Sequence, residues 1–362
     1  MKHLESSLLA KYIQISIFKT MISQFENPQM SYLIQQEQLS SIDPEFELIW
    51  ASRPSSGNIL SSIHERRERI NGVIGNLVDG LGAFAGEIED ISIPVRDGHS
   101  IDGRVWRPPQ TTGQQPLVVW YHGGGFCMGD ISMNEPLCRR VCSDLQCVVV
   151  SVAYRLAPEH VFPTGINDAW DAFNWIAANV ASLGANPAAG FIVGGSSAGA
   201  NISIVLSHLA RDSKIIPPLT GVYLGIPLVV HHDAVPPQYL THYKSFAQNK
   251  DAPILNEESI RFLEGQLEPV PSDPLYSPLL WPTGHKDLPP TYFQVCGLDP
   301  LRDDGLIYED LLRRECGVET KIDVYPGVPH GFNSGFPSLN SSRKFENDGM
   351  EGMKWLLERQ ST

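Results

Sequence analysis

Residues 191–201 read Phe-Ile-Val-Gly-Gly-Ser-Ser-Ala-Gly-Ala-Asn, and they decide how the rest of the sequence is interpreted. A short apolar run typical of a buried strand leads into small residues, and apolar positions at helical spacing follow over residues 202–209. Between them, Gly195 and Gly199 frame the pattern G-x-S-x-G, in which glycines let the backbone turn sharply and expose the central hydroxyl. We therefore expect Ser197 to be a nucleophile at a strand-to-helix turn.

The pentapeptide alone is weak evidence, because a chain with 31 glycines among 362 residues can contain it by chance. A glycine-rich turn without chemistry is the alternative interpretation. Two features favour catalysis. The match lies between a strand pattern and a helix pattern, and the residues beside Ser197 are small, as close backbone packing requires.

The composition indicates a soluble globular protein, with 42% hydrophobic and 19% charged residues and no apolar run long enough to span a bilayer. The formal charge of −14 disfavours nucleic acid and anionic membrane surfaces as partners, since both attract basic proteins. Residues 1–21 mix charged and apolar positions, so we expect an amphipathic helix there rather than a signal peptide. We therefore expect a cytoplasmic protein, whose functional chain could also begin at Met21 or Met30.

The six cysteines are expected to be free thiols. No secretory signal precedes them, and Cys147 and Cys296 fall inside apolar strand patterns. No C-x-x-C pair occurs, so the sequence does not support a zinc site. The adjacent His231 and His232, with Asp233, lack further ligands nearby in the sequence, and we interpret them as a solvated lid segment. No metal or cofactor is expected.

Apolar strand patterns alternate with helical patterns through most of the chain. Strands are expected at 91–95, 101–106, 117–121, 148–153, 191–193, 222–226, 292–296 and 320–324, and helices at 166–180, 198–211, 304–316 and 343–358. The first two strands, joined through Asp97 and Gly98, are typical of an antiparallel hairpin. The remaining alternation indicates an α/β fold with a mostly parallel sheet and helices on both faces. Ligands bind at the carboxyl ends of the strands in such sheets.

Two segments fall outside this alternation. Near the N-terminus, interrupted helices are expected at 32–39, 45–50 and 59–70. More than 60 residues separate the strands at 222–226 and 292–296, which is too long for an ordinary loop, and they include a helical pattern at 257–267. We interpret both segments as a lid. Residues 1–88 form an N-terminal helical cap segment, and residues 89–362 form the catalytic domain with a cap insertion at about 227–275.

A glycine loop follows the strand expected at 117–121, and it reads His-Gly-Gly-Gly-Phe over residues 122–126. Three consecutive glycines leave backbone N–H groups that no side chain shields, and such a loop forms half of the oxyanion hole in lipases and esterases. We assign the N–H groups of Gly124 and Gly125 as oxyanion donors. The N–H group of Ala198 is the third donor.

A phosphate-binding turn is the alternative for this glycine loop. Neither G-x-G-x-x-G nor G-x-x-x-x-G-K is present, because Met128 occupies the place of the third dinucleotide glycine. We expect His122 to brace the loop rather than to act as a base. The glycines expected to support the site are Gly123, Gly195 and Gly199.

A serine hydroxyl becomes a strong nucleophile only beside a base, and the partners are expected downstream in the order Ser, acid, His. Asp299 and His330 each follow an expected strand directly, so both reach the same edge of the sheet as Ser197. Asp303 and Asp304 are rival acids, but they begin the next helix, where capping and the helix dipole explain them. The other histidines lie in helical, hairpin or lid contexts.

A long loop after the strand expected at 148–153 contains Tyr-Arg-Leu-Ala-Pro-Glu-His over residues 154–160. We expect Arg155 to pair with a buried carboxylate and to hold this loop beside the glycine loop. Glu159 and His160 are expected to be structural, because as catalysts they would duplicate a complete triad.

Together these motifs resemble the hormone-sensitive-lipase-like (family IV) esterases of the α/β-hydrolase superfamily. The resemblance extends from about residue 90 to the C-terminus and rests on five motifs in the family's order, at residues 122–125, 154–163, 195–199, 299–303 and 330–332. It implies an eight-stranded sheet with a helical cap, and hydrolysis of short- to medium-chain esters without metal or cofactor. Two positions depart from many relatives, Ser196 in place of an acidic residue and Ala200 in place of glycine.

The predicted function is therefore a serine carboxylesterase that acts on a small-molecule ester through an acyl-enzyme on Ser197, with a tailoring role in a biosynthetic pathway as one form. Two alternatives stay open. The same site could perform non-hydrolytic acyl transfer, elimination or cyclisation, or the chain could be a non-catalytic small-molecule receptor on this fold. Both a monomer and a homodimer are compatible with the sequence.

Overall fold

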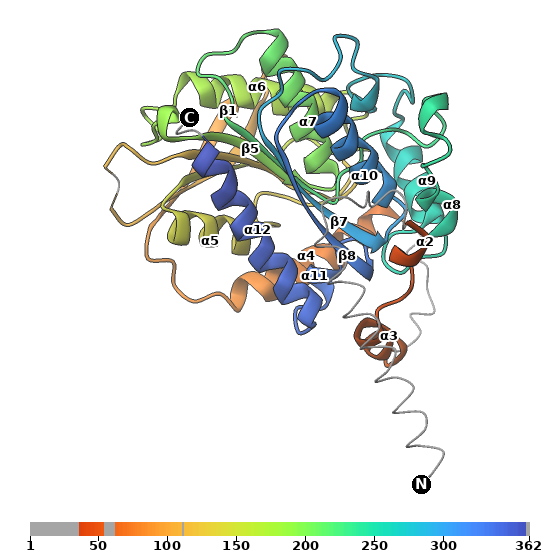
Figure 1. Ribbon diagram of the computed structural model, residues 1–362. Helices are drawn as coiled ribbons and strands as arrows, with labels where there is room; N and C mark the ends of the chain where they lie inside the picture. The colour runs from red at the N-terminus through yellow and green to blue at the C-terminus, as the bar shows by residue number, and fades with distance from the viewer. Residues whose placement is uncertain (1–35, 54–61, 111, 360–362) are drawn as a thin grey trace, which may run out of the picture.

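The computed structural model of the chain describes residues 36–53, 62–110 and 112–359 (Figure 1). The helix predicted over residues 1–21 and the alternative starts at Met21 and Met30 lie outside these residues. The described strands are β1 (Glu87–Pro94), β2 (Ser100–Arg107), β3 (Leu117–Tyr121), β4 (Val148–Val152), β5 (Phe191–Ser196), β6 (Gly221–Gly225), β7 (Thr291–Leu298) and β8 (Thr320–Pro329).

These strands form one eight-stranded sheet in the order β1-β2-β4-β3-β5-β6-β7-β8. The strands β1 and β2 form the antiparallel hairpin predicted from the sequence, with Ile93 opposite Ile101. The β2 strand also pairs with β4 in antiparallel fashion, and all other pairs are parallel. Every residue of β3 and β4 is buried, because helices cover both faces of the sheet. The predicted mostly parallel α/β sheet is therefore confirmed.

Helices cover the sheet in two layers (Figure 1). The helices α6 (Thr164–Ala178), α7 (Ala198–Asp212) and α10 (Arg302–Asp310) contribute to one large apolar core, which also contains the inward side chains of the central strands. The helices α5 (Glu135–Leu145) and α12 (Asn340–Glu358) contribute to a second core on the opposite face. The expected helices at 166–180, 198–211 and 343–358 are thus present with slightly different ends.

Two elements differ from the sequence-based expectation. The helix α5 was not predicted, because its buried face is made of Cys138, Val141 and Cys142 rather than of larger aliphatic side chains. The β8 strand was predicted to end at residue 324 but continues to Pro329 through two prolines and a glycine. This extension is tolerated because β8 is the last strand of the sheet, where a missing N–H group costs little.

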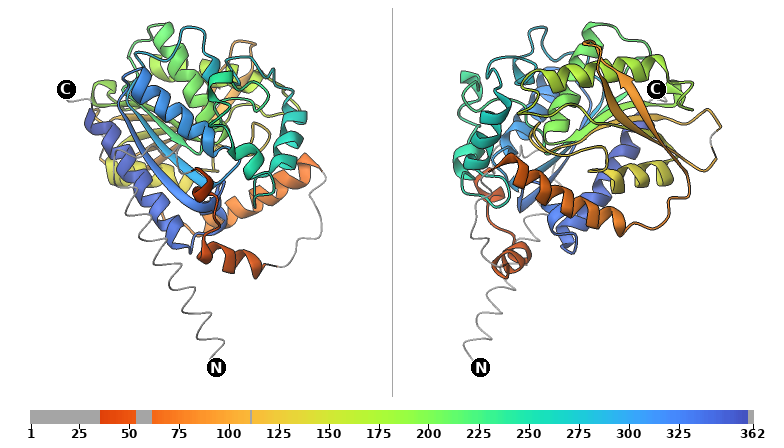
Figure 2. Two further views of the ribbon diagram at one scale, coloured as in Figure 1. Left: turned by 45° about the vertical axis from the view of Figure 1, so that its right-hand side comes forward. Right: turned by 180° about the vertical axis from the view of Figure 1, so that it is seen from behind.

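The N-terminal segment and the insertion between β6 and β7 contain further helices (Figure 2). They are α2 (Gln36–Leu39), α3 (Pro44–Ala51), α4 (Ile63–Asp79), α8 (Ser245–Gln248) and α9 (Glu257–Leu267), and the short α11 (Phe332–Gly335) follows β8. The two segments contact each other, since the guanidinium of Arg66 lies 4.2 Å from the ring centroid of Phe262. The expected helix at 59–70 corresponds to α4, which continues to Asp79 and begins with a capping box of Ser62 and Glu65.

The first turn of α10 holds the insertion against the sheet. Asp304 Oδ1 accepts hydrogen bonds from the backbone N–H groups of Val229 and Val230, at 2.8 and 3.0 Å. Asp303 Oδ2 accepts the N–H group of Ser245 at 2.7 Å. The prediction that these two carboxylates cap α10 is therefore wrong, because no side chain caps this helix and both acids bind the insertion instead.

All six cysteines are free thiols, as predicted. Burial raises the pKa of Cys142 and of Cys147 to about 12, so neither thiol ionises at neutral pH. In the described ranges, no helix combines the length and the apolar character needed to cross a membrane.

Candidate active site

Ser197 lies at the junction of β5 and α7, in a backbone conformation that is rare for any residue with a side chain. Its φ and ψ are 56° and −117°, and its N–H group donates to Gly225 O at 2.8 Å. The turn needs glycine on both sides. A Cβ atom on Gly195 would lie 2.3 Å from the carbonyl carbon of Gly199, and one on Gly199 would lie 2.0 Å from Tyr121 O. This is the strand-to-helix turn that the motif predicts.

The structure brings Ser197, His330 and Asp299 together in one chain of hydrogen bonds. Ser197 Oγ lies 2.8 Å from His330 Nε2, and His330 Nδ1 lies 2.7 Å from Asp299 Oδ2. A carboxylate only accepts, so Nδ1 carries the proton and Nε2 presents its lone pair to the serine hydroxyl. Asp299 and His330 are 1% and 8% exposed, so water competes little for these bonds.

The Asp299 loop at the end of β7 is fixed on both sides. The N–H group of Leu301 donates to Asp299 Oδ1 at 2.9 Å, so each carboxylate oxygen has a partner. The side chain of Asn249, from the insertion, donates to the carbonyl of Asp299 at 2.8 Å. Nothing in the sequence places the insertion against this loop, so the role of Asn249 was not predicted. The insertion therefore fixes the loop that carries Asp299.

The glycine loop, residues 122–128, lies directly against Ser197. A Cβ atom on Gly123 would lie 3.4 Å from the Cβ atom of Ser197 and 2.9 Å from Ser196 O, so only glycine allows this approach. Gly124 and Gly125 have φ values of 107° and 60°, in the region that favours glycine.

The N–H groups predicted to bind the oxyanion are those of Gly124, Gly125 and Ala198. In the described part of the chain, no backbone carbonyl accepts a hydrogen bond from the N–H group of Gly124 or Gly125. Ala198 is the first residue of α7, where N–H groups have no partner within the helix. Asn201 is the first residue of this helix whose N–H group finds a backbone acceptor, at Ser197 O. All three donors belong to the segments that meet at Ser197.

His122 makes the contacts of a brace. Its Nδ1 lies 2.7 Å from Gly123 O and its ring stacks on Tyr154 with 4.4 Å between centroids. The Tyr154 hydroxyl donates to the carbonyl of His122 at 2.8 Å. Burial lowers the pKa of His122 to about 4, so the ring is neutral at pH 7 and fixes the start of the glycine loop.

Arg155 forms the predicted ion pair with a buried carboxylate. Its Nε and Nη2 donate to the two oxygens of Asp168 in α6, at 2.8 and 2.6 Å, and Asp168 is 1% exposed. Its Nη1 lies 2.8 Å from Asp97 Oδ2 in the hairpin turn. The hydrogen bond from Arg155 lowers the pKa of Asp97 to about 2. This network holds the segment 154–163 beside the glycine loop.

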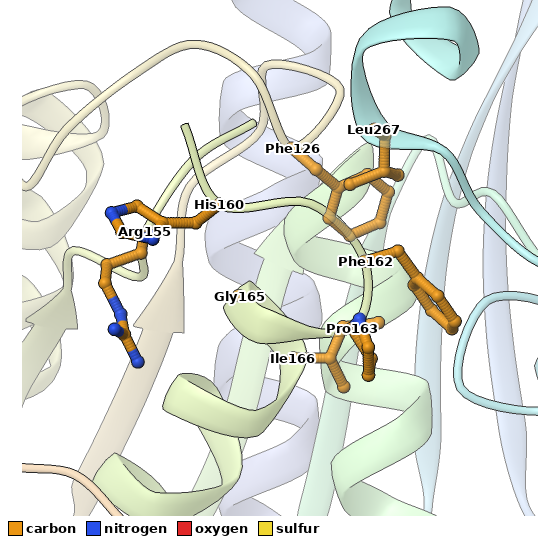
Figure 3. A pocket seen from close by; sticks show the side chains of 8 residues that line it. All are labelled: Phe126, Arg155, His160, Phe162, Pro163, Gly165, Ile166 and Leu267. Carbon is orange, nitrogen blue, oxygen red and sulfur yellow. The ribbon is translucent and has the colours of Figure 1, made fainter. Parts of the chain in front are cut away.

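A small apolar pocket begins at Phe126, directly after the last glycine of the loop (Figure 3). It is a shallow, partly open space with room for about one water molecule. Its lining consists of Phe126, Arg155, His160, Phe162, Pro163, Gly165, Ile166 and Leu267. Leu267, the last residue of α9, closes the pocket from the insertion side, and its carbonyl accepts the N–H group of Phe162 at 2.9 Å.

One group of described residues has donor atoms close enough to consider a metal. His231, His232 and Glu264 place one ligand atom each within 4.8 Å of one another. The expectation that this histidine pair is solvated and lacks a further ligand is wrong, because Glu264 on α9 lies 3.3 Å from His231 Nε2 and His231 is buried. However, His231 Nδ1 accepts the N–H group of Asp233 at 3.0 Å, so its proton is on Nε2 and points to Glu264. This is a hydrogen-bonding arrangement, and it does not fit a neutral histidine ligand.

Comparison with known proteins agrees with this geometry. A family model for the alpha/beta hydrolase fold matches residues 118–334. An AB hydrolase superfamily protein from Schizosaccharomyces pombe is 40% identical over 324 residues, which are 89% of this chain and 95% of that protein. Versiconal hemiacetal acetate esterase from Dothistroma septosporum is 33% identical over 310 residues, or 85% of this chain and 94% of the esterase. The crystal structure of vibralactone cyclase superposes with a TM-score of 0.84 at 37% identity, covering 90% of this chain and 97% of the cyclase.

Proposed function

The chain belongs to the hormone-sensitive-lipase-like family of esterase-type α/β hydrolases, and we propose that it is a serine carboxylesterase that hydrolyses short- to medium-chain esters of small molecules. The proposal rests on one observation above all. Ser197 Oγ, His330 and the buried Asp299 are joined by hydrogen bonds of 2.8 and 2.7 Å. Beside them, the N–H groups of Gly124 and Gly125 have no backbone acceptor among the described residues. This is the arrangement that acyl transfer requires.

In the proposed reaction, Ser197 Oγ attacks the ester carbonyl while His330 Nε2 takes the hydroxyl proton. Asp299 keeps the proton of His330 on Nδ1 and stabilises the imidazolium that forms. His330 then gives its proton to the leaving alcohol, and the acyl group stays on Ser197. Water enters, loses a proton to His330 and releases the acid, which restores the serine hydroxyl.

The tetrahedral intermediates carry negative charge on the former carbonyl oxygen. We propose that the N–H groups of Gly124, Gly125 and Ala198 bind this oxygen. These backbone groups need little reorganisation, since the turn at Gly124 and the start of α7 hold them in place. Each well-aimed donor of this kind is worth about two to three orders of magnitude in rate.

The pocket beside Phe126 supports a preference for short chains. In this structure it has room for about one water molecule, so a long acyl chain could enter only if several lining side chains moved. Its lining is mostly apolar, with Phe162 and Leu267 on opposite segments. We propose that it takes the apolar part of a short- to medium-chain ester.

A graded series of nitrophenyl esters tests this function. We expect Ser197-dependent turnover of the acetate, butyrate and hexanoate, with a steep decline for longer chains. The Ser197→Ala variant should be inactive on all of them and keep the wild-type thermal unfolding midpoint. Equal turnover by the wild type and by Ser197→Ala would contradict the proposal, and absence of turnover with every ester would favour the receptor alternative.

A second candidate function is cyclisation or acyl transfer at the same site. The observation that favours it is the likeness to vibralactone cyclase, at 37% identity. In this variant of the reaction, a hydroxyl group of the substrate or of a second alcohol replaces water in the attack on the acyl-enzyme. Product analysis in ¹⁸O-labelled water separates the two, because only hydrolysis places the label in the released acid.

The name versiconal hemiacetal acetate esterase describes a relative that acts on an acetate ester. We accordingly propose a tailoring deacylase of secondary metabolism, in the cytoplasm, as the form of the function to test first. A panel of acetate esters with alcohols of increasing bulk tests it. A higher kcat/KM for bulky alcohols than for ethyl acetate is the expected result, and a preference for ethyl acetate would contradict it.

A further inference from the structure

Arg67, in helix α4 of the N-terminal segment, reaches the glycine loop. Its Nε donates to the carbonyl of Cys127 at 2.7 Å, and its Nη2 donates to the carbonyl of Ala157, also at 2.7 Å. The Arg67 side chain is 24% exposed, so the contact is largely shielded from water. One guanidinium therefore binds two separate loops that lie next to the nucleophile.

Glu159 orients this guanidinium. Arg67 Nη1 donates to Glu159 Oε1 and Nη2 donates to Glu159 Oε2, both at 2.7 Å. This two-pronged contact fixes the plane of the fork, so that Nε and Nη2 point at the two carbonyls. A lysine ammonium could not make these contacts together, since it has a single nitrogen. Glu159 was predicted to be structural, and its partner is Arg67.

The glycine loop needs such support because its backbone is unusual over three consecutive residues. Gly124, Gly125 and Phe126 have φ values of 107°, 60° and 60°, and the last of these is strained for a residue with a side chain. The N–H group of Cys127 donates to Gly124 O at 3.1 Å, which closes the turn. The N–H group of Met128, which shares a peptide group with the Cys127 carbonyl, donates to Gly124 O at 3.0 Å. A force on that peptide group is therefore transmitted to the peptide that joins Gly124 and Gly125.

A further hydrogen bond joins the same two loops directly. The N–H group of Ala157 donates to Phe126 O at 3.0 Å. Ala157 thus binds the glycine loop through its N–H group and Arg67 through its carbonyl. Arg67, Cys127, Phe126 and Ala157 form a closed ring of contacts, which opens if the guanidinium is removed.

We propose that Arg67 is a positioning residue for catalysis, which holds the N–H groups of Gly124 and Gly125 at the oxyanion. This inference rests on the proposed esterase function. The N-terminal segment then contributes to the chemical step as well as to covering the site. A displaced N–H donor stabilises the transition state less, because negative charge develops on the substrate oxygen only there. We therefore expect kcat to fall and KM to stay nearly unchanged.

The test compares Arg67→Met with a matched control, Arg96→Met. Arg96 also makes a two-pronged contact with a carboxylate, since its Nε and Nη2 donate to Asp171 at 2.9 and 2.8 Å, but its partners are in α6. For Arg67→Met we expect kcat on nitrophenyl butyrate to fall about 10- to 100-fold, less than for complete removal of a donor, with KM within about threefold. For Arg96→Met we expect kcat and KM to stay within about twofold of wild type. We expect its unfolding midpoint to fall about as much as that of Arg67→Met.

The rate at which a fluorophosphonate labels Ser197 gives a second measure, since its transition state also places an oxygen in the oxyanion hole. We expect Arg67→Met to lower this rate in parallel with kcat. If Arg67→Met does not fold, Arg67→Lys takes its place, with an expected loss in kcat of about three- to tenfold from the missing fork. A kcat within about twofold of wild type for the folded variant would overturn the inference, as would an equal loss in Arg96→Met. Failure of the esterase function itself has a different signature, namely no Ser197-dependent turnover by the wild type.

Discussion

The carboxylate of Asp304 lies 2.8 Å from the backbone nitrogen of Val229, and this hydrogen bond joins the start of α10 to the chain that leaves β6. The same oxygen accepts the N–H group of Val230 at 3.0 Å. Asp304 is 1% exposed, and burial raises its pKa to about 8 from the ordinary 3.8. The attachment of the insertion therefore depends on an acid that holds a proton in the folded state.

This shift in pKa predicts how stability depends on pH. The folded state keeps the Asp304 proton up to about pH 8, whereas the unfolded chain releases it near 3.8. The contribution of Asp304 to the free energy of unfolding is full below pH 4 and is lost as the pH rises through 8. Asp304→Asn imitates the protonated acid, so we expect its stability relative to wild type to increase steadily from pH 5 to pH 8.

Urea unfolding midpoints of both proteins at four pH values between 5 and 8 provide the measurement. Asp251→Asn is the control for the loss of a carboxylate, because Asp251 is exposed. A constant difference between wild type and Asp304→Asn across this range would show that Asp304 is already ionised in the folded protein.

Replacing Asp299 by asparagine removes the acceptor that keeps the His330 proton on Nδ1. We expect kcat to fall by about 10⁴, because the wrong tautomer of His330 faces the Ser197 hydroxyl. The unfolding midpoint should change little, since the asparagine oxygen can still accept from Leu301 at the position of Asp299 Oδ1. Steady-state kinetics and thermal unfolding check this. A loss in kcat of less than about tenfold would mean that Asp299 does not orient the base.

Gly124→Ala tests whether the conformation of the glycine loop is needed for catalysis. The new Cβ atom would lie 2.2 Å from Met128 O, so the turn must open and move the N–H group of Gly124. Gly98→Ala is the control, because Gly98 also has a positive φ, of 86°, but has no atom within 4 Å of its Cβ position. We expect kcat to fall at least about 100-fold for Gly124→Ala and less than about twofold for Gly98→Ala. Equal effects of the two substitutions on kcat would contradict the assignment.

The pocket at Phe126 predicts a change in chain-length preference. Leu267→Ala enlarges the pocket from the insertion side, and the expected outcome is a rise in kcat/KM for octanoate relative to acetate of about tenfold. Val270→Ala is the control, since Val270 is 51% exposed and does not line the pocket. An unchanged ratio in Leu267→Ala would mean that the pocket does not receive the acyl chain.

Much of this molecule is predictable from the sequence, because its chemistry is carried by short motifs at strand ends. Ser197, Asp299 and His330 each directly follow a strand, and parallel strands bring their carboxyl ends to one edge of the sheet. The same reasoning predicts the pair between Arg155 and a buried acid. The glycines are explained by the close approaches at Gly195 and Gly199, which leave no room for a Cβ atom.

Contacts between distant segments were not predictable in this way. The sequence contains no signal that Arg67 reaches the glycine loop, since it lies in a helix with other charged residues and its partner in that loop is a backbone carbonyl. The partners of Asp303 and Asp304 were missed for a related reason. Acidic residues at the start of a helix usually accept hydrogen bonds from N–H groups of its first turn. Here the folded insertion provides the N–H groups that Asp303 and Asp304 bind. Such contacts depend on the path of the N-terminal segment and of the insertion, whose loops between the helices have no periodic pattern.

Labelling by a fluorophosphonate, followed by peptide mass spectrometry, tests the central claim most directly. The proposed mechanism predicts a single modified residue, Ser197, together with complete loss of esterase activity in proportion to labelling. It also predicts that His330→Ala is labelled far more slowly, because the serine then lacks the base 2.8 Å away. Labelling at another residue, or full activity after Ser197 has been modified, would contradict the account.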